Sequence, residues 1–325
     1  MGMNILLDKL NLLDRTVEES MRENNVPGAV FALIKSGKLA DQRLYGVSDV
    51  TTGAPITAQT YFEAASLTKP VFAYTVFRLA DAGVIDLDRP LYTYGVQPPS
   101  DDPRVELVTA KHALSHATGM PNWDKHPLSL AFTPGESFSY SGEGYAYLQR
   151  TVEHLTGRRL DDLMQEYAFD ALGMEGATMI WTPALQRSFA TAHDADGKPK
   201  PLRKNARHSS GYEPNAAYSL YADVGVYPPF LQCLARNFDP MFAAVQNPAG
   251  HGVHWGLGLG FYEELVWHWG DNGGYKSLFL VDRETGDALL MHTNGYNGLE
   301  VCFTAFELLT GRDLSDVSAF IASAE

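Results

Sequence analysis

The sequence predicts an α+β fold, in which an antiparallel sheet is flanked by helices. Strand-type runs occur near both ends of the 325-residue chain, with helical runs beside them, and the middle is mainly helical and rich in loop signals. Strands at both ends around a helical insert can pair in one sheet. We therefore expect a single domain (1–325) with an α/β lobe from about 1–65 and 255–325, a mainly helical lobe from about 84–250, and a helix at 66–82 between them.

The first elements are a helix and two strands. Residues 5–23 mix Leu and Ile with charged residues at helical spacing, and the run stops at 24–28, where Asn, Pro and Gly follow. This pattern is typical of an amphipathic surface helix and not of a secretory signal, which needs an unbroken apolar core. Residues 30–36 and 42–47 are β-type runs around a glycine-containing turn, and they predict an antiparallel pair.

Helical spacing of apolar residues returns at 66–82, and Gly83 follows where a helix C-terminus favours glycine. We expect a buried helix there. A second helix is predicted at 144–156, within the loop-rich middle. The remaining predicted elements are strands at 257–263, 276–281 and 288–293, and a last helix at 299–309.

Charge and cysteine content limit the classes of partner. The chain has 25 Lys and Arg against 39 Asp and Glu, a net charge of −14, which repels phosphate backbones and anionic lipids. Neither nucleic acid nor a membrane is an expected partner, and no uncharged run is apolar enough to span a bilayer. Cys233 and Cys302 are too few for a disulfide framework, so without a secretory signal we expect a cytoplasmic protein. Its oligomeric state stays open.

Several signatures of cofactor and metal chemistry are absent. The chain has no Gly-x-Ser-x-Gly, no phosphate-binding loop and no dinucleotide fingerprint, so no cofactor is expected. His112 and His116 have the i, i+4 spacing of a zinc pair on a helix. No Glu lies between them and no third ligand is evident. We therefore expect no metal and interpret both histidines as hydrogen-bonding residues.

Ser66-Leu67-Thr68-Lys69 opens the predicted buried helix. A separation of three residues places Ser66 and Lys69 on one helical face, about 5 Å apart. The positive end of the helix favours negative charge near Ser66 and disfavours the protonated form of Lys69. A buried lysine with a lowered pKa can act as a base for a serine nucleophile. The alternative is that Ser66 only caps the helix and Lys69 lies on the surface.

Two further motifs follow in order, Tyr140-Ser141-Gly142 before helix 144–156 and His268-Trp269-Gly270 before strand 276–281. With Ser-x-x-Lys they resemble the signature of the penicillin-recognising serine hydrolases. The chain is similar to the class C β-lactamase superfamily, which contains class C β-lactamases, DD-peptidases, D-aminopeptidases and family VIII carboxylesterases, and is closest in character to the last. Segments 114–121, 132–135 and 268–277 share this similarity, which extends from about residue 27 to residue 294.

The resemblance implies a β-lactamase/DD-peptidase-like fold with the active site in the cleft between two lobes. It implies that Ser66 is the acyl nucleophile and that Lys69 and Tyr140 share its proton transfer, with either of them as the base. His268 stands where β-lactamases have a lysine. The oxyanion hole would use the backbone N–H groups of Ser66 and Asp271.

The resemblance also implies that Trp269, Gly270 and Gly142 line the substrate site. Gly142 replaces the Asn that holds an acylamide side chain, and His268 is less cationic than Lys, so we do not expect efficient β-lactam hydrolysis. A serine hydrolase of carboxylic esters fits better. The alternatives are a D-amino-acid peptidase, amidase or weak β-lactamase with the same residues, and a non-catalytic binding protein. Four aromatic residues either line an acyl pocket or belong to the core: Trp123, Tyr212, Tyr218 and Trp255.

Overall fold

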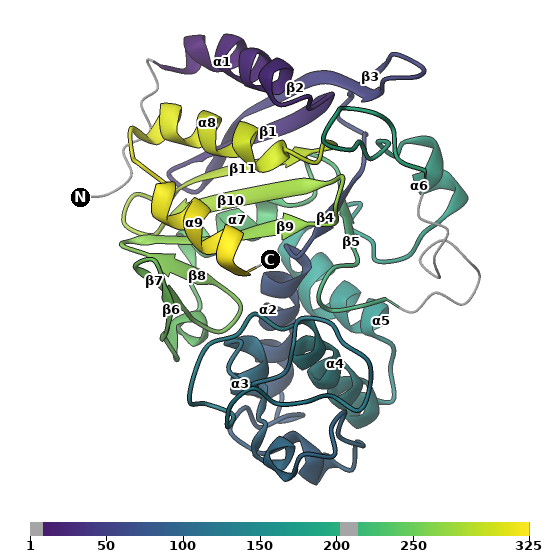
Figure 1. Ribbon diagram of the computed structural model, residues 1–325, viewed down its shortest axis with the longest axis vertical. Coiled ribbons are helices and arrows are strands. Elements are labelled where there is room, and N and C mark those ends of the chain that lie inside the picture. Colours follow the sequence, from purple (N-terminus) through teal and green to yellow (C-terminus); the bar gives the residue numbers. More distant parts are fainter. Residues whose placement is uncertain (1–8, 202–213, 325) are drawn as a thin grey trace.

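The computed structural model describes residues 9–201 and 214–324. Nine strands form one antiparallel sheet in the order β3-β2-β1-β11-β10-β9-β8-β7-β6. They are β1 (Gly28–Lys35), β2 (Lys38–Asp49), β3 (Ala54–Pro55), β6 (Asn247–Gly250), β7 (Val253–Trp255), β8 (Gly260–Tyr262), β9 (Leu265–Asp271), β10 (Lys276–Asp282) and β11 (Asp287–Thr293). With helices on both of its faces, this sheet confirms the predicted α+β class (Figure 1).

The two ends of the chain meet at the centre of the sheet. β1 pairs with β2 on one side and with β11 on the other, so that Ala29 lies opposite Thr293. The predicted strands at 30–36, 42–47, 276–281 and 288–293 correspond to β1, β2, β10 and β11. Burial explains the pairing, because β1, β10 and β11 are apolar on both faces and need cover from both sides.

Helices cover each face of the sheet with a separate part of the core. From β1, Val30, Ala32 and Ile34 pack with α2 and α7, whereas Phe31 and Leu33 pack with α1, α8 and α9. Successive side chains of a strand point to opposite faces, which accounts for this division. The covering helices are α1 (Leu10–Glu23), α2 (Thr68–Asp81), α7 (Pro228–Arg236), α8 (Gly298–Thr310) and α9 (Ser315–Ala324).

A second group of helices lies below the sheet in Figure 1, and α2 runs between the two. α2 contacts α5 and the π-helical segment after it, and α3 packs on α4. These elements are α3 (Ala110–Leu114), α4 (Gly142–Thr156), α5 (Leu160–Met164), the π-helix Gln165–Asp170, and 3₁₀ helices at Leu91–Tyr94 and Pro103–Leu107. α6 (Pro183–Arg187) lies level with the sheet at the right of the view (Figure 1), and another 3₁₀ helix spans Pro240–Ala243. A small sheet pairs β4 (Phe62–Ala65) with β5 (Leu220–Ala222).

The structure differs from the sequence expectations at several elements. α7 and β6 lie within 84–250, yet α7 packs on β1, β10 and β11, and β6 extends the sheet next to β7. β9 and α9 are regular elements that the patterns did not predict. The predicted first helix begins at Leu10, and its residues 5–8 lie outside the described residues. Across 9–201 and 214–324, no helix has the length and apolar content needed to cross a bilayer.

Candidate active site

Ser66 lies in the turn between β4 and α2. β4 ends at Ala65, whose φ of 52° is in the left-handed region, and α2 begins at Thr68. The N-cap residue is Leu67 and no side chain caps this helix, so the interpretation of Ser66 as a simple cap is wrong. Its Oγ instead lies 3.0 Å from Nζ of Lys69. The three-residue spacing therefore brings the two groups together as predicted.

Lys69 is 1% exposed although it carries an amine. Its Nζ also donates to the carbonyl of Ala217 (2.9 Å) and lies 4.7 Å from the ring centre of Tyr140. In the described parts of the chain no carboxylate forms an ion pair with it. Burial lowers the pKa of Lys69 well below its ordinary value of 10.5. A neutral amine has a lone pair that can accept the proton of Ser66.

Tyr140 is 8% exposed and stands just before α4. The adjacent Ser141 fixes this loop, because its Oγ accepts from Gly144 N (3.0 Å) as the helix cap and donates to Pro121 O (2.8 Å). Its backbone N–H donates to Nδ1 of His116 (3.0 Å), whose ring lies 4.2 Å from that of Tyr140. The position of Tyr140 over Lys69 is therefore set by backbone and imidazole contacts.

The two histidines at i, i+4 do not share a helical face. α3 ends at Leu114, and His116 has a φ of 55°, which turns it away from the helical path. His112 accepts from the backbone N–H of Thr109 in a capping box, and His116 accepts from Ser141. Their interpretation as hydrogen-bonding residues is confirmed. Among residues 9–201 and 214–324, no group of three or more His, Cys, Asp or Glu could hold a metal ion.

Gly270 brings the edge of β9 against Ser66. The pairing of β8 with β9 stops at Trp267, and the following residues of β9 run past the end of β8. A Cβ on Gly270 would lie 2.5 Å from the carbonyl of Ala64 and 3.3 Å from the backbone N of Ser66. Only glycine allows this close approach. A carbonyl carbon attached to Ser66 Oγ would thus lie beside the backbone of β9.

His268 is completely buried. Its pKa is held well below 6.5 by burial and, secondly, by the charge of Lys69. Nδ1 lies 2.6 Å from the carbonyl of Trp269, so a neutral ring must place its proton there and leave Nε2 as an acceptor. Within the part of the chain that the structure describes, Nε2 has no hydrogen-bond partner. His268 is therefore no substitute for a lysine cation at neutral pH.

The Asp271 carboxylate has a structural contact, and Trp269 differs from the expectation for the strand. The Asp271 carboxylate pairs with Nζ of Lys276 and accepts from Gly273 N (2.6 Å), so it stabilises the turn after β9. Trp269 is only 2% exposed, and its ring packs 4.7 Å from that of Tyr140 and 5.9 Å from that of Phe320. Its indole supports Tyr140 from within the core and has little surface to offer a substrate.

The remaining sequence candidates separate into surface and core. Gly142 is the first residue of α4, and the indole of Trp123 lies directly over it. Trp123 is 48% exposed and its ring contacts Tyr218 at 5.4 Å. Trp255 is completely buried and belongs to the core, whereas Tyr212 lies outside the described residues.

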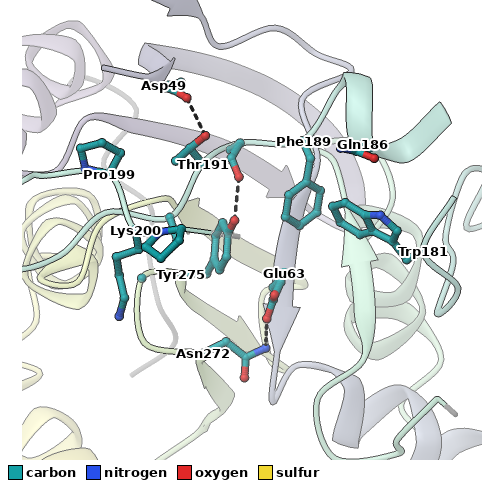
Figure 2. A pocket seen from close by; sticks show the side chains of 14 residues that line it. Asp49, Glu63, Trp181, Gln186, Phe189, Thr191, Pro199, Lys200, Asn272 and Tyr275 are labelled. Atoms are coloured by element: carbon teal, nitrogen blue, oxygen red, sulfur yellow. Dashed lines mark hydrogen bonds between the residues drawn. The ribbon is translucent and has the colours of Figure 1, made fainter. Parts of the chain in front are cut away.

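A cavity of about 590 Å³ opens beside Asn272, the residue after Asp271 (Figure 2). Asn272 Nδ2 donates to a carboxylate oxygen of Glu63, and this bond crosses one side of the cavity. Tyr275 donates to the carbonyl of Ala190 at 2.7 Å on the other side. The lining comes from segments that are distant in sequence, so sequence reasoning missed it, as it missed the Ala217 carbonyl.

A serine and an uncompensated buried lysine at the start of α2, beside a glycine edge of an antiparallel sheet, place this protein among the β-lactamase-fold serine hydrolases. The family model described as Beta-lactamase matches residues 13–305, and the chain belongs to that family. This result confirms the resemblance on which the sequence interpretation depends.

Curated relatives and solved structures support this assignment. Esterase EstB of Burkholderia gladioli is 26% identical, with 88% of this chain and 91% of the relative covered. Penicillin-binding protein 4 of Amycolatopsis lactamdurans is 27% identical over 84% of this chain and 82% of the relative. The D-alanine carboxypeptidase AmpC structure from Burkholderia cenocepacia has a TM-score of 0.78 at 18% identity, covering 94% of this chain and 99% of that one. That last likeness concerns the fold.

Proposed function

We propose that this protein hydrolyses carboxylic esters of small molecules through an acyl-enzyme on Ser66. The observation that carries the proposal is the buried amine of Lys69, 3.0 Å from Ser66 Oγ and without a carboxylate partner in the described residues. An amine held in that state is a base, whereas a structural lysine would be paired. The similarity to Esterase EstB over most of both chains supports ester substrates.

In the acylation step, Lys69 takes the proton of Ser66 as Oγ forms a bond to the ester carbonyl carbon. The carbonyl π electrons move to oxygen, and backbone N–H groups of Ser66 and Asp271 stabilise that oxyanion. The C–O bond to the alcohol then breaks, and the proton on Lys69 reaches the leaving oxygen through Tyr140. The 4.7 Å between Lys69 Nζ and the Tyr140 ring centre keeps these two groups adjacent.

Deacylation reverses the roles with water as the nucleophile. Water attacks the acyl carbon, its proton passes to the Lys69 and Tyr140 pair, and Ser66 Oγ leaves with a proton returned from that pair. His268 would accept a hydrogen bond through Nε2, from the Tyr140 hydroxyl or the substrate. Because His268 is neutral, the site offers no fixed cation there for a substrate carboxylate, which favours uncharged esters.

The test compares wild type with Ser66→Ala on short-chain p-nitrophenyl esters. We expect turnover in wild type and a loss of at least about 10³-fold in the variant, because the acyl-enzyme can no longer form. Intact mass after treatment with a fluorophosphonate should show one adduct that Ser66→Ala lacks. Ester turnover that persists in folded Ser66→Ala would contradict the proposal, and a wild type inert to probe and ester would indicate a binding protein.

The second candidate is hydrolysis of D-amino-acid peptides, amides or β-lactams by the same residues. The observation in its favour is the match to Penicillin-binding protein 4 of Amycolatopsis lactamdurans. Side-by-side rates on a D-alanyl amide, a chromogenic cephalosporin and a p-nitrophenyl ester separate the two. We expect the ester to be cleaved fastest, and a faster rate on either of the other two would favour this second candidate.

A further inference from the structure

Trp123 occupies the space of the side chain that Gly142 lacks. A Cβ built on Gly142 would lie 2.2 Å from Cζ2 and 2.5 Å from Cε2 of Trp123, so the indole rests on the bare α-carbon. Any other residue at 142 would collide with the ring. The third position of the Tyr-Ser-Gly motif is therefore not vacant, because an aromatic ring from another segment fills it.

The backbone beside Trp123 is anchored to the N-terminus of α4. The carbonyl of Asn122 accepts from the N–H groups of Gly142 (3.1 Å) and Glu143 (3.2 Å), and its side-chain Oδ1 accepts from Gly142 N (3.0 Å). Ser141 Oγ donates to the carbonyl of Pro121. These bonds fix the backbone of the two residues before Trp123, and its indole, which is 48% exposed, lies over Gly142.

The indole of Trp123 packs against a second aromatic ring, that of Tyr218. Trp123 meets Tyr218 at 5.4 Å between ring centres and 71° between planes. Tyr218 follows Ala217, whose carbonyl holds Nζ of Lys69, and Gly142 follows Tyr140 by two residues, whose ring lies on the same amine. The aromatic pair thus joins the two backbone segments that flank Lys69.

We propose that Trp123 and Tyr218 form the acyl-binding wall of the site and select esters with apolar acyl chains over esters with acylamino chains. This inference rests on the proposed function. The face of an indole carries no hydrogen-bond donor or acceptor, so the N–H and C=O of an acylamino group stacked on it would lose their water without gaining partners. An alkyl or aryl chain has no such loss and buries apolar surface.

The test uses methyl pentanoate and N-acetylglycine methyl ester, whose acyl chains have equal length and whose hydrolysis is followed by proton release. Wild type should prefer the pentanoate by about tenfold or more in kcat/KM. Trp123→Ala should lower kcat/KM for the pentanoate about tenfold and change that for the acetylglycinate by less than about threefold. Tyr92→Ala, which removes an aromatic that is 39% exposed in a distant 3₁₀ helix, should leave both rates unchanged.

A pair of variants tests the contact itself. Gly142→Asn should reduce hydrolysis of both esters at least about tenfold, because its Cβ collides with the indole, and Trp123→Ala in the same chain should restore activity and raise the relative rate on the acetylglycinate. Full activity in Gly142→Asn, or an unchanged ratio of esters in Trp123→Ala, would overturn the wall. If either result occurs but Ser66→Ala still abolishes hydrolysis, only the acyl-binding wall is rejected and the proposed function stands. If hydrolysis does not depend on Ser66, both proposals are rejected.

Discussion

Two almost fully buried lysines differ in their surroundings: Lys69 lies beside Ser66, and Lys276 lies in β10 opposite Asp271. Lys69 is 1% exposed and Lys276 is 5% exposed. Lys276 Nζ forms an ion pair with the carboxylate of Asp271 and lies 4.9 Å from the ring centre of Tyr296. Lys69 contacts only a hydroxyl, a carbonyl and aromatic rings among the described residues.

The difference shows how burial acts on a lysine with and without a carboxylate beside it. At Lys276 the carboxylate of Asp271 offsets the cost of burial, and the ion pair ties the β9–β10 turn. At Lys69 no carboxylate of the described residues offsets the cost of burial. The cost is therefore seen as a lowered pKa of the amine. His116 and His268 follow the second pattern, since burial lowers both of their pKa values. Burial thus disfavours positive charge around the start of α2, whereas the turn after β9 holds an ion pair.

The largest expected effect comes from Lys69→Met, which keeps the length of the side chain and removes the amine. Ester kcat/KM should fall by about 10³-fold, because Ser66 loses its base and no neighbouring carboxylate can replace it. Initial rates on p-nitrophenyl esters measure this loss, and near-UV circular dichroism checks the fold. A folded variant with wild-type rates would show that Lys69 is not the base and that it does not differ in role from Lys276.

Gly270→Ala tests the approach of β9 to Ser66 and should have the second largest effect. The new Cβ would lie 2.5 Å from the Ala64 carbonyl and 3.3 Å from Ser66 N, so strand and turn must separate. An oxyanion hole shared by Ser66 and Asp271 would then widen, and we expect kcat to fall about 10²-fold with a smaller change in KM. Gly83→Ala is the matched control, because a Cβ there meets nothing within 4 Å although its φ of 72° adds local strain.

The sequence was sufficient for the central elements of the fold because their signals are local. The strands at 30–36 and 288–293 and the helix at 66–82 are long apolar runs whose spacing identifies them. β6 has four residues, two of which are Pro and Gly, and β7 has only three, so no periodicity marks them. α7 could be recognised as helical in character, but its position on β1 and β11 depends on tertiary packing that no local pattern contains.

The same division applies to the candidate site. Ser66 and Lys69 are three residues apart on one chain segment, so geometry alone predicts their contact. The carbonyl of Ala217 is a backbone group, so no residue type identifies it as a partner. It lies 148 positions from Lys69 in the sequence. Trp123 over Gly142 is equally non-local. The burial of Trp269 depends on α9, a helix that the pattern did not reveal.

Lys276→Met breaks the other half of the comparison and should act mainly on stability. Asp271 keeps the hydrogen bond from Gly273 but loses its cation, and its side chain is 24% exposed, so water screens part of the loss. We expect the free energy of unfolding to fall by about 1–2 kcal/mol and ester kcat to change by less than about tenfold. Urea unfolding measures the change in the free energy of unfolding, and Asp271→Asn in the same chain should recover part of the lost stability. A loss of activity as large as that of Lys69→Met would show that the two lysines do not divide the roles.

The smallest effect is a change in the pH dependence of stability in Lys69→Met. Folded wild type holds Lys69 with a pKa well below 10.5, whereas the unfolded chain binds that proton up to pH 10.5. The unfolded state therefore binds more protons in this window, so this group's contribution lowers stability at neutral pH and recovers as pH rises. Methionine does not bind a proton, so it makes no such pH-dependent contribution. The variant should therefore be more stable than wild type near pH 7, and the difference in stability should shrink toward pH 10. Urea midpoints at several pH values in this range measure it. A difference independent of pH would mean that Lys69 stays protonated in the folded protein, and its hydrogen bond to Ser66 would then be that of a donor cation and not of a base.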